Sequence, residues 1–119
     1  MGVCILVAGC GPFVDVLDVR RVSSEERAAA LNVDLVLPGM PRPQNMIFVG
    51  PVEATSCKNL LTDPPASRAN ATEQLKIKAL RMGANAVVDF SCDASGTDTY
   101  GTNCWNSVSC AGSAVRLQK

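Results

Sequence analysis

Four cysteines constrain this chain more than any other feature: Cys57, Cys92, Cys104 and Cys110, in a sequence that contains no histidine. Zinc sites usually take their ligands in close pairs or with imidazole, and these four cysteines offer neither. We therefore expect two structural disulfides rather than a metal site. Disulfides persist outside the reducing cytosol, so the cysteines also indicate an oxidising compartment.

Size and composition agree with a domain that needs such bonds. The chain has 119 residues, enough for one small domain, and it holds one Trp, one Tyr and three Phe. With few large apolar side chains, such a domain buries limited surface and is marginally stable. Two disulfides would each contribute about 3–4 kcal/mol in the chain-entropy model, which is comparable with the whole expected stability.

Charge and hydropathy exclude two classes of partner. The formal net charge is zero, so no global basic balance indicates nucleic acid. No stretch approaches the roughly 20 apolar residues of a membrane-spanning helix. Any contact with a membrane is therefore expected through an anchor.

A candidate anchor lies near the start of the chain. Residues 3–10 read V-C-I-L-V-A-G-C, and an aliphatic run that ends in Ala8-Gly9-Cys10 is similar to a bacterial lipobox. We expect residues 1–10 to be a signal remnant and Cys10 to carry lipid. Only nine residues precede Cys10, none of them Lys or Arg, whereas a secretory signal has about 15–30 residues and a positive start. The alternatives are a start further upstream, or a short buried strand with two ordinary cysteines.

Residues 11–45 are expected to form a partly structured tether. The Val- and Leu-rich stretch 13–19 is typical of a short strand, and 33–37 is apolar enough to be ordered. Ser23 and Ser24, followed by two glutamates and an alanine run, predict a capped helix of two turns. Three prolines within residues 38–43 then interrupt regular structure.

The folded domain is expected over residues 46–119, beginning with a strand and a helix. Residues 46–52 predict a strand, which Pro51 either ends or confines to a sheet edge. Cys57 is placed in a polar loop that runs on through residues 58–69. Asn70 and Glu73 predict a capping box at the start of a helix, and Gly83 predicts its end. One apolar face of this helix is expected to contain Ala71, Leu75, Ala79 and Met82.

Two further strands are expected after this helix. Alternation over residues 84–92 places Ala86, Val88, Phe90 and Cys92 on one face. The same pattern over 107–117 places Val108, Cys110, Gly112 and Ala114 together. The whole predicts an α+β fold: a small disulfide-stapled domain with one main helix packed on a few-stranded β-sheet.

The sequence offers little for catalysis. Without histidine the commonest general base is missing, and neither C-x-x-C nor G-x-S-x-G occurs. We expect no enzyme activity, no cofactor and no metal. Lys76, Lys78 and Arg81 lie within a locally basic stretch, which is either a solvated helix face or a docking surface. Trp105 beside Cys104 is interpreted mainly as cover for a disulfide, with partner binding as the alternative.

Several segments together resemble the RcsF family, which are outer-membrane lipoproteins that sense envelope stress. They are V-G-P-V-E-A-T-S-C at 49–57, the Pro64-Pro65 loop, M-G-A-N-A-V at 82–87, S-C at 91–92, C-W-x4-C at 104–110 and G-S-A at 112–114. The resemblance covers residues 46–118. It implies disulfides Cys57–Cys104 and Cys92–Cys110, a small α/β domain, and lipid on Cys10. Because Gly11 rather than Asp follows that cysteine, it also implies sorting to the outer membrane.

The family resemblance implies signalling to the Rcs phosphorelay by protein–protein contact. The implied partners are the barrel-assembly machine, outer-membrane barrel proteins and an inner-membrane regulator of the phosphorelay. The Val- and Leu-rich tether departs from the family's long, polar, proline-rich one. Two other functions stay open: a structural or barrel-associated envelope lipoprotein without phosphorelay signalling, and a protein that handles thiols or metals.

Overall fold

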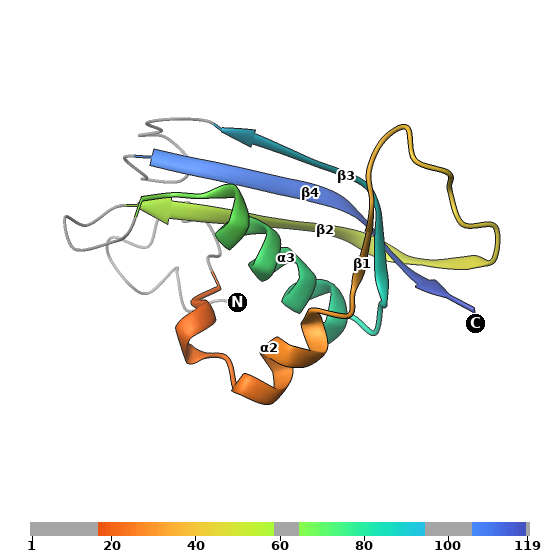
Figure 1. The fold of residues 1–119 in the computed structure, drawn as a ribbon, viewed down its shortest axis with the longest axis horizontal. Helices are drawn as coiled ribbons and strands as arrows, with labels where there is room; N and C mark the ends of the chain where they lie inside the picture. Colours follow the sequence, from red (N-terminus) through yellow and green to blue (C-terminus); the bar gives the residue numbers. More distant parts are fainter. Residues whose placement is uncertain (1–16, 59–64, 95–105, 119) are drawn as a thin grey trace, which may run out of the picture.

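A four-stranded mixed sheet carries the fold of this chain (Figure 1). The structure, a computed structural model, describes residues 17–58, 65–94 and 106–118. Its elements are a 3-10 helix η1 (Val19–Arg21), helices α2 (Ser24–Ala30) and α3 (Arg68–Arg81), and strands β1 (Asp34–Val36), β2 (Met46–Lys58), β3 (Ala86–Ala94) and β4 (Asn106–Leu117). The architecture is α+β, with one main helix on a few-stranded sheet, as the sequence predicts.

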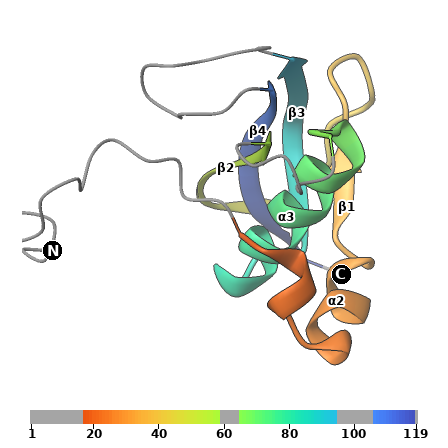
Figure 2. The ribbon, with the colours of Figure 1, turned by 90° about the vertical axis from the view of Figure 1, so that its left-hand side faces the viewer.

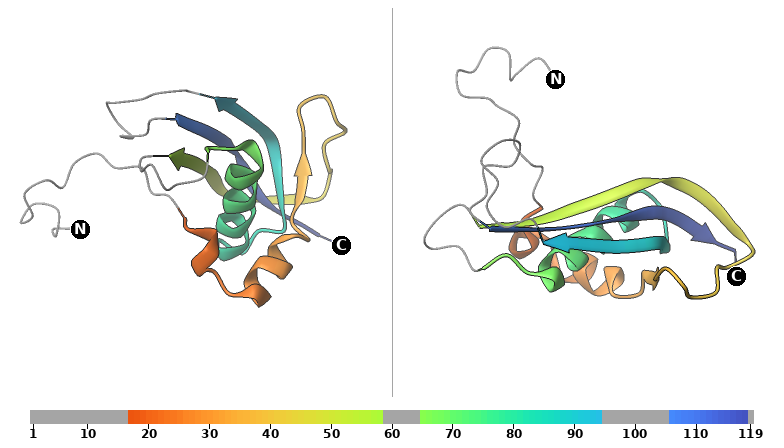
Figure 3. Two further views of the ribbon diagram at one scale, coloured as in Figure 1. Left: turned by 60° about the vertical axis from the view of Figure 1, so that its left-hand side comes forward. Right: turned by 90° about the horizontal axis from the view of Figure 1, so that it is seen from above.

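The strand order is β1-β3-β4-β2. β1 runs parallel to β3, whereas β4 is antiparallel to both β3 and β2. Helix α3 packs on the sheet, and η1 and α2 lie beside α3 (Figure 2). Residues 37–45 connect β1 to β2 around the end of the sheet where the chain's C-terminus lies (Figure 3).

Helix α3 begins three residues earlier than the sequence predicts. The side chain of Ser67 accepts a hydrogen bond from the Asn70 main-chain N–H at 3.0 Å, so Ser67 and not Asn70 is the N-cap. Both residue types cap helices well, and the sequence pattern alone chose the wrong one. The predicted end is confirmed: Gly83 follows the helix with φ of +90°, a conformation that glycine adopts without steric cost.

The buried side of α3 is wider than the predicted face. Ala71, Leu75 and Ala79 are fully buried against the sheet, as expected, but Met82 remains 37% exposed. Gln74 and Ile77 are also fully buried, although the sequence did not single them out. Ile77 packs on the N-terminal segment in a second cluster whose buried members are Val19, Val22 and Ala30.

Strand β3 contains a bulge that overturns part of the predicted alternation. Its register with β4 shifts between Val88 and Ser91, and Asp89 within this interval has φ of +55°. Ala86 and Val88 therefore join one cluster with Val36 and Val115, whereas Phe90 packs in the main core below α3. The expectation that Phe90 shares a face with Val88 is wrong, because one extra residue reverses the side-chain direction.

Gly112 of β4 fits against this bulge because it has no side chain. A Cβ atom there would lie 2.5 Å from Cγ1 of Val87 and 2.9 Å from the carbonyl oxygen of Val88. The predicted face of β4 is otherwise confirmed, since Val108, Cys110 and Ala114 all contact the main core.

Strand β2 is longer than expected and reaches beyond Cys57. It pairs with β4 from Met46 to Lys58, and Cys57 lies opposite Ser107. The prediction of a loop at Cys57 is therefore wrong. Pro51 is tolerated because β2 is an edge strand, one of the two outcomes the sequence predicted.

The segment assigned to a partly structured tether contributes directly to the fold. Helix α2 is capped by Ser23 as predicted, and β1 forms the other edge of the sheet. Val19 belongs to η1 instead of the predicted strand, and residues 13–16 lie outside the described residues. The folded unit thus begins well before residue 46.

A disulfide joins Cys92 of β3 to Cys110 of β4, which lie opposite each other with their Cα atoms 4.0 Å apart. This is one of the two pairs that the family resemblance implies. Cys57 is also disulfide-bonded. Its predicted partner Cys104 lies outside the described residues, so the pair Cys57–Cys104 stays a prediction.

Candidate interaction surface around helix α3

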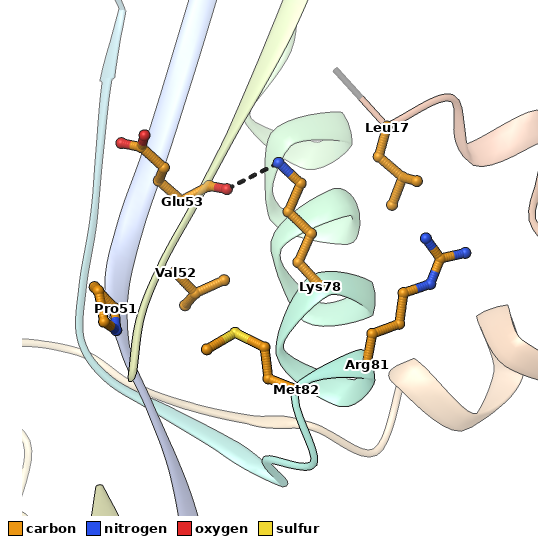
Figure 4. Close-up of a pocket in the computed structure, with 7 residues that line it drawn as sticks. All are labelled: Leu17, Pro51, Val52, Glu53, Lys78, Arg81 and Met82. Carbon is orange, nitrogen blue, oxygen red and sulfur yellow. Dashed lines mark hydrogen bonds between the residues drawn. The ribbon is translucent and has the colours of Figure 1, made fainter. Parts of the chain in front are cut away.

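Among the residues that the structure describes, two open grooves flank α3. The first lies between α3 and β2, has a volume of about 420 Å³, and is lined by Leu17, Pro51, Val52, Glu53, Lys78, Arg81 and Met82 (Figure 4). The second lies between α3 and α2, has a volume of about 600 Å³, and is lined by Arg27, Ala30, Leu31, Arg68, Ala69, Thr72, Glu73 and Lys76. Both combine an apolar floor with charged side chains.

Side chains of α3 bind the outer edge of β2. Lys78 Nζ donates to the carbonyl oxygen of Glu53 at 3.1 Å, and Gln74 Nε2 donates to that of Thr55 at 3.0 Å (Figure 4 shows the first bond). Four helical residues rise about 6 Å and two strand residues about 6.8 Å, so the two spacings match. Together these bonds engage two successive outward-facing carbonyls of an edge strand.

Gln74 joins three parts of the molecule. Besides its bond to β2, its Nε2 donates to Asn70 Oδ1 at 2.7 Å, and its Oε1 accepts from the main-chain N–H of Leu17 at 3.1 Å. The side chain is fully buried, so these bonds compensate the loss of water. Sequence reasoning missed Gln74 because it is polar. The available signal was its i, i+4 spacing from Asn70.

Two ion pairs brace α2 against α3. Arg81 binds both carboxylate oxygens of Glu26 at 2.7 and 2.9 Å, and Arg27 binds Glu73 at 3.0 Å. Glu26 and Arg27 are neighbours of opposite charge on α2. They pair with Arg81 and Glu73, which lie two turns apart on α3. The hydrogen bonds from Arg81 lower the pKa of Glu26, and the same bonds raise the pKa of Arg81.

The predicted docking residues do not form one surface. Lys76 lines the second groove, whereas Lys78 and Arg81 line the first. Lys78 is bonded to β2 and Arg81 to α2, so both contribute to the fold. Trp105, the remaining candidate for partner binding, lies outside the described residues.

No metal site emerges from the part of the chain that the structure describes. Within it, no group of three or more His, Cys, Asp or Glu side chains is placed to hold an ion. Among the same residues, no helix has the length and apolar character needed to cross a bilayer.

Comparison with known proteins identifies the family. The family model for the RcsF lipoprotein matches residues 44–118. This chain belongs to the RcsF lipoprotein family. The outer membrane lipoprotein RcsF of Escherichia coli K12 is 36% identical over 70 residues, which cover 58% of this chain and 49% of that protein. The same values hold for RcsF of Escherichia coli O6:H1 strain CFT073. This chain thus spans about half the length of the curated RcsF proteins that it matches.

The RcsF match contains β2, α3, β3 and β4, and it leaves η1, α2 and β1 outside. The fold also occurs in a protein of unknown function of the DUF74 family from Pediococcus pentosaceus ATCC 25745. That structure is 16% identical, covers 71% of this chain and 98% of its own, and superposes with a TM-score of 0.52. At this identity the likeness concerns the fold alone.

Proposed function

We propose that this chain is an outer-membrane lipoprotein that senses envelope stress and signals to the Rcs phosphorelay by protein–protein contact, without catalysis of its own. Membership of the RcsF lipoprotein family over residues 44–118 carries this proposal. The implied partners are the barrel-assembly machine, outer-membrane barrel proteins and an inner-membrane regulator of the phosphorelay.

Two features support a location in the envelope. The Cys92–Cys110 disulfide fits a compartment outside the reducing cytosol. Cys10 follows an Ala8-Gly9 pair and is proposed to carry the lipid, with Gly11 favouring sorting to the outer membrane. The protein would then be lipid-anchored and face the periplasm or the cell surface.

The geometry narrows the proposed docking surface. Arg81 and Lys78 already serve contacts within the fold, so reversing their charge would disturb the protein itself. Lys76 and Arg68 line the second groove beside the 69% exposed Leu31. We propose that the second groove, with Lys76, contributes to partner binding, and that Trp105 is a further candidate.

One observation favours the alternative function, a structural or barrel-associated role without phosphorelay signalling. Residues 17–36 pack on the folded domain, here called the head. They therefore do not lengthen the spacer, the stretch of chain between Cys10 and the head. A shorter spacer limits the distance over which the head can meet an inner-membrane partner.

Complementation distinguishes these two functions. The chain, with a complete lipoprotein signal sequence placed before Cys10, is expressed in a bacterium that lacks its own RcsF and carries an Rcs-dependent reporter. We expect envelope stress to induce the reporter, and Cys10→Ala to abolish induction together with outer-membrane fractionation. Normal outer-membrane levels without induction would reject signalling and leave the structural role.

A further inference from the structure

We propose that residues 17–31, here called the N-terminal strap, are a releasable segment that sets how far the folded head can move from its anchor. The strap consists of η1, α2 and the residues beside them. The proposal rests on the proposed function in one respect, since it takes Cys10 as the point of attachment.

Within the described residues, a small apolar cluster, two partly exposed ion pairs and one hydrogen bond to Gln74 hold the strap. Its buried apolar residues are small, Val19, Val22 and Ala30, and they meet Ile77 of α3. The two ion pairs to α3 are partly exposed, with side-chain exposures of 48% and 28% in one and 44% and 32% in the other. Partly exposed ion pairs of this kind contribute little stability.

Main-chain bonds to the sheet begin only after the strap, at whose end the N–H groups of Asn32 and Val33 bind the carbonyls of Ala29 and Ala30 at 3.1 Å. Among the described residues, no main-chain hydrogen bond joins residues 17–31 to α3 or to the sheet; Leu17 N–H binds the Gln74 side chain instead. After the strap, Asp34 N–H donates to the carbonyl of Asn85 at 3.1 Å, and β1 pairs with β3. The strap can therefore open while β1 stays paired with β3.

Burial indicates the same boundary. Leu31 is 69% exposed and lies in a turn with Asn32. Val33, the next residue, is 3% exposed in the main core, and Val36 is 9% exposed on the sheet. Segments with few buried contacts open at lower free energy than the core, so we place the hinge at Leu31–Asn32.

Release would change the reach of the head about three-fold. With the strap bound, the seven Cα–Cα steps from Cys10 to Leu17 span at most about 25 Å when fully extended. With the strap released, the 23 Cα–Cα steps from Cys10 to Val33 span at most about 80 Å. Release also uncovers the apolar side chain of Ile77, so the bound state is favoured until something else covers that face.

Hydrogen exchange tests whether the strap opens by itself. In the purified full chain, we expect peptides from residues 17–31 to exchange faster than those of β3 and β4. Glu26→Arg or Arg81→Glu should speed exchange of the strap roughly three- to ten-fold, and the double swap Glu26→Arg/Arg81→Glu should restore it. Glu25→Arg, which changes the neighbouring charge, serves as the control. Exchange of the strap at the same rate as the sheet in all variants would overturn the proposal.

Vesicles test the reach. A strap-open variant, Val22→Asp/Ala30→Asp, places carboxylates in the apolar cluster and should release the strap. On vesicles that contain dansyl-headgroup lipid, energy transfer from Trp105, the single tryptophan, should fall about two-fold or more. If hydrogen exchange shows that the strap is open in this variant and energy transfer to the vesicle is unchanged, the proposed increase in reach is wrong. A protein that fails to bind vesicles at all contradicts the anchor at Cys10 and leaves the exchange result intact.

Discussion

Gln74 illustrates how one polar side chain organises this small domain. Its amide uses both donor and acceptor atoms, and its partners come from β2, α3 and the strap. A buried amide of this kind is tolerated because its polar atoms are bonded, and it becomes costly once a partner is removed.

We expect Gln74→Leu to destabilise the protein by about 1–3 kcal/mol. Leucine has a similar size but leaves the Thr55 carbonyl and the Leu17 N–H without their buried partner. The measurement is the free energy of unfolding in urea. Gln44→Leu, at an exposed position, is the matched control and should change stability little. Equal effects of the two substitutions would contradict the role assigned to Gln74.

At the residue scale, the sequence predicted what hydrophobic spacing reports. Ala71, Leu75 and Ala79 recur at helical intervals and are buried as expected. Gln74 and the N-cap Ser67 were missed because polar residues carry no such signal. Ser67 and Asn70 are both good caps, and only the position of β2 selects between them: Ser56 Oγ accepts from the Ser67 N–H at 3.0 Å.

At the scale of elements, the bulge in β3 is the feature that alternation could not reveal. Asp89 adopts a positive φ, which Asp tolerates better than most residues, and its carboxylate binds Arg42 at 2.8 Å. A period of two predicts side-chain direction only while pairing stays regular. The sequence therefore located β3 well and misjudged the face of Phe90.

The packing of α2 on α3 should weaken at low pH. The pKa of Glu26 is lowered from its usual 4.5 in the folded state, mainly by hydrogen bonds from Arg81. Its contribution is therefore fully present above about pH 4.5 and is lost as pH falls through the lowered folded value. We expect thermal melts of the wild type and Glu26→Gln to converge below pH 4.5.

Glu25→Gln is the control for this pH dependence, since Glu25 makes no ion pair within the described part of the chain. It should track the wild type at every pH. A difference between wild type and Glu26→Gln that persists unchanged to pH 3 would show that the Glu26–Arg81 pair is not responsible.

At the scale of the whole molecule, the two expected disulfides should contribute unequally to the free energy of unfolding. In the chain-entropy model, Cys57–Cys104 closes the longer loop and contributes about 4 kcal/mol, against about 3 kcal/mol for Cys92–Cys110. Cys57→Ser/Cys104→Ser should therefore lower the free energy of unfolding more than Cys92→Ser/Cys110→Ser. Peptide mapping without reduction comes first, and a Cys57 linked to any other cysteine would refute the predicted pairing.

The extent of the folded unit was the hardest property to predict. Prolines and short apolar runs marked residues 11–45 as a tether, although the α2 helix and an ordered 33–37 were both expected. Whether such a segment docks depends on a receiving surface, here Ile77 of α3, and the sequence does not pair the two. The chain after residue 46 was predicted better because regular hydrophobic spacing marks its helix and most of its strand residues, although β2 and β4 pair across a long stretch of sequence.

The bonds from Gln74 and Lys78 to the outer edge of β2 affect how neighbouring copies of the protein can pair when they are crowded together. Lipidated proteins diffuse in two dimensions and meet repeatedly in similar orientations, which favours the joining of exposed strand edges into intermolecular sheets. In this protein Pro51 offers no N–H, and the carbonyls of Glu53 and Thr55 are already bonded within the chain. Two carbonyl acceptors and one N–H donor are thus withdrawn from this stretch of the β2 edge, which leaves a neighbouring copy fewer main-chain partners there.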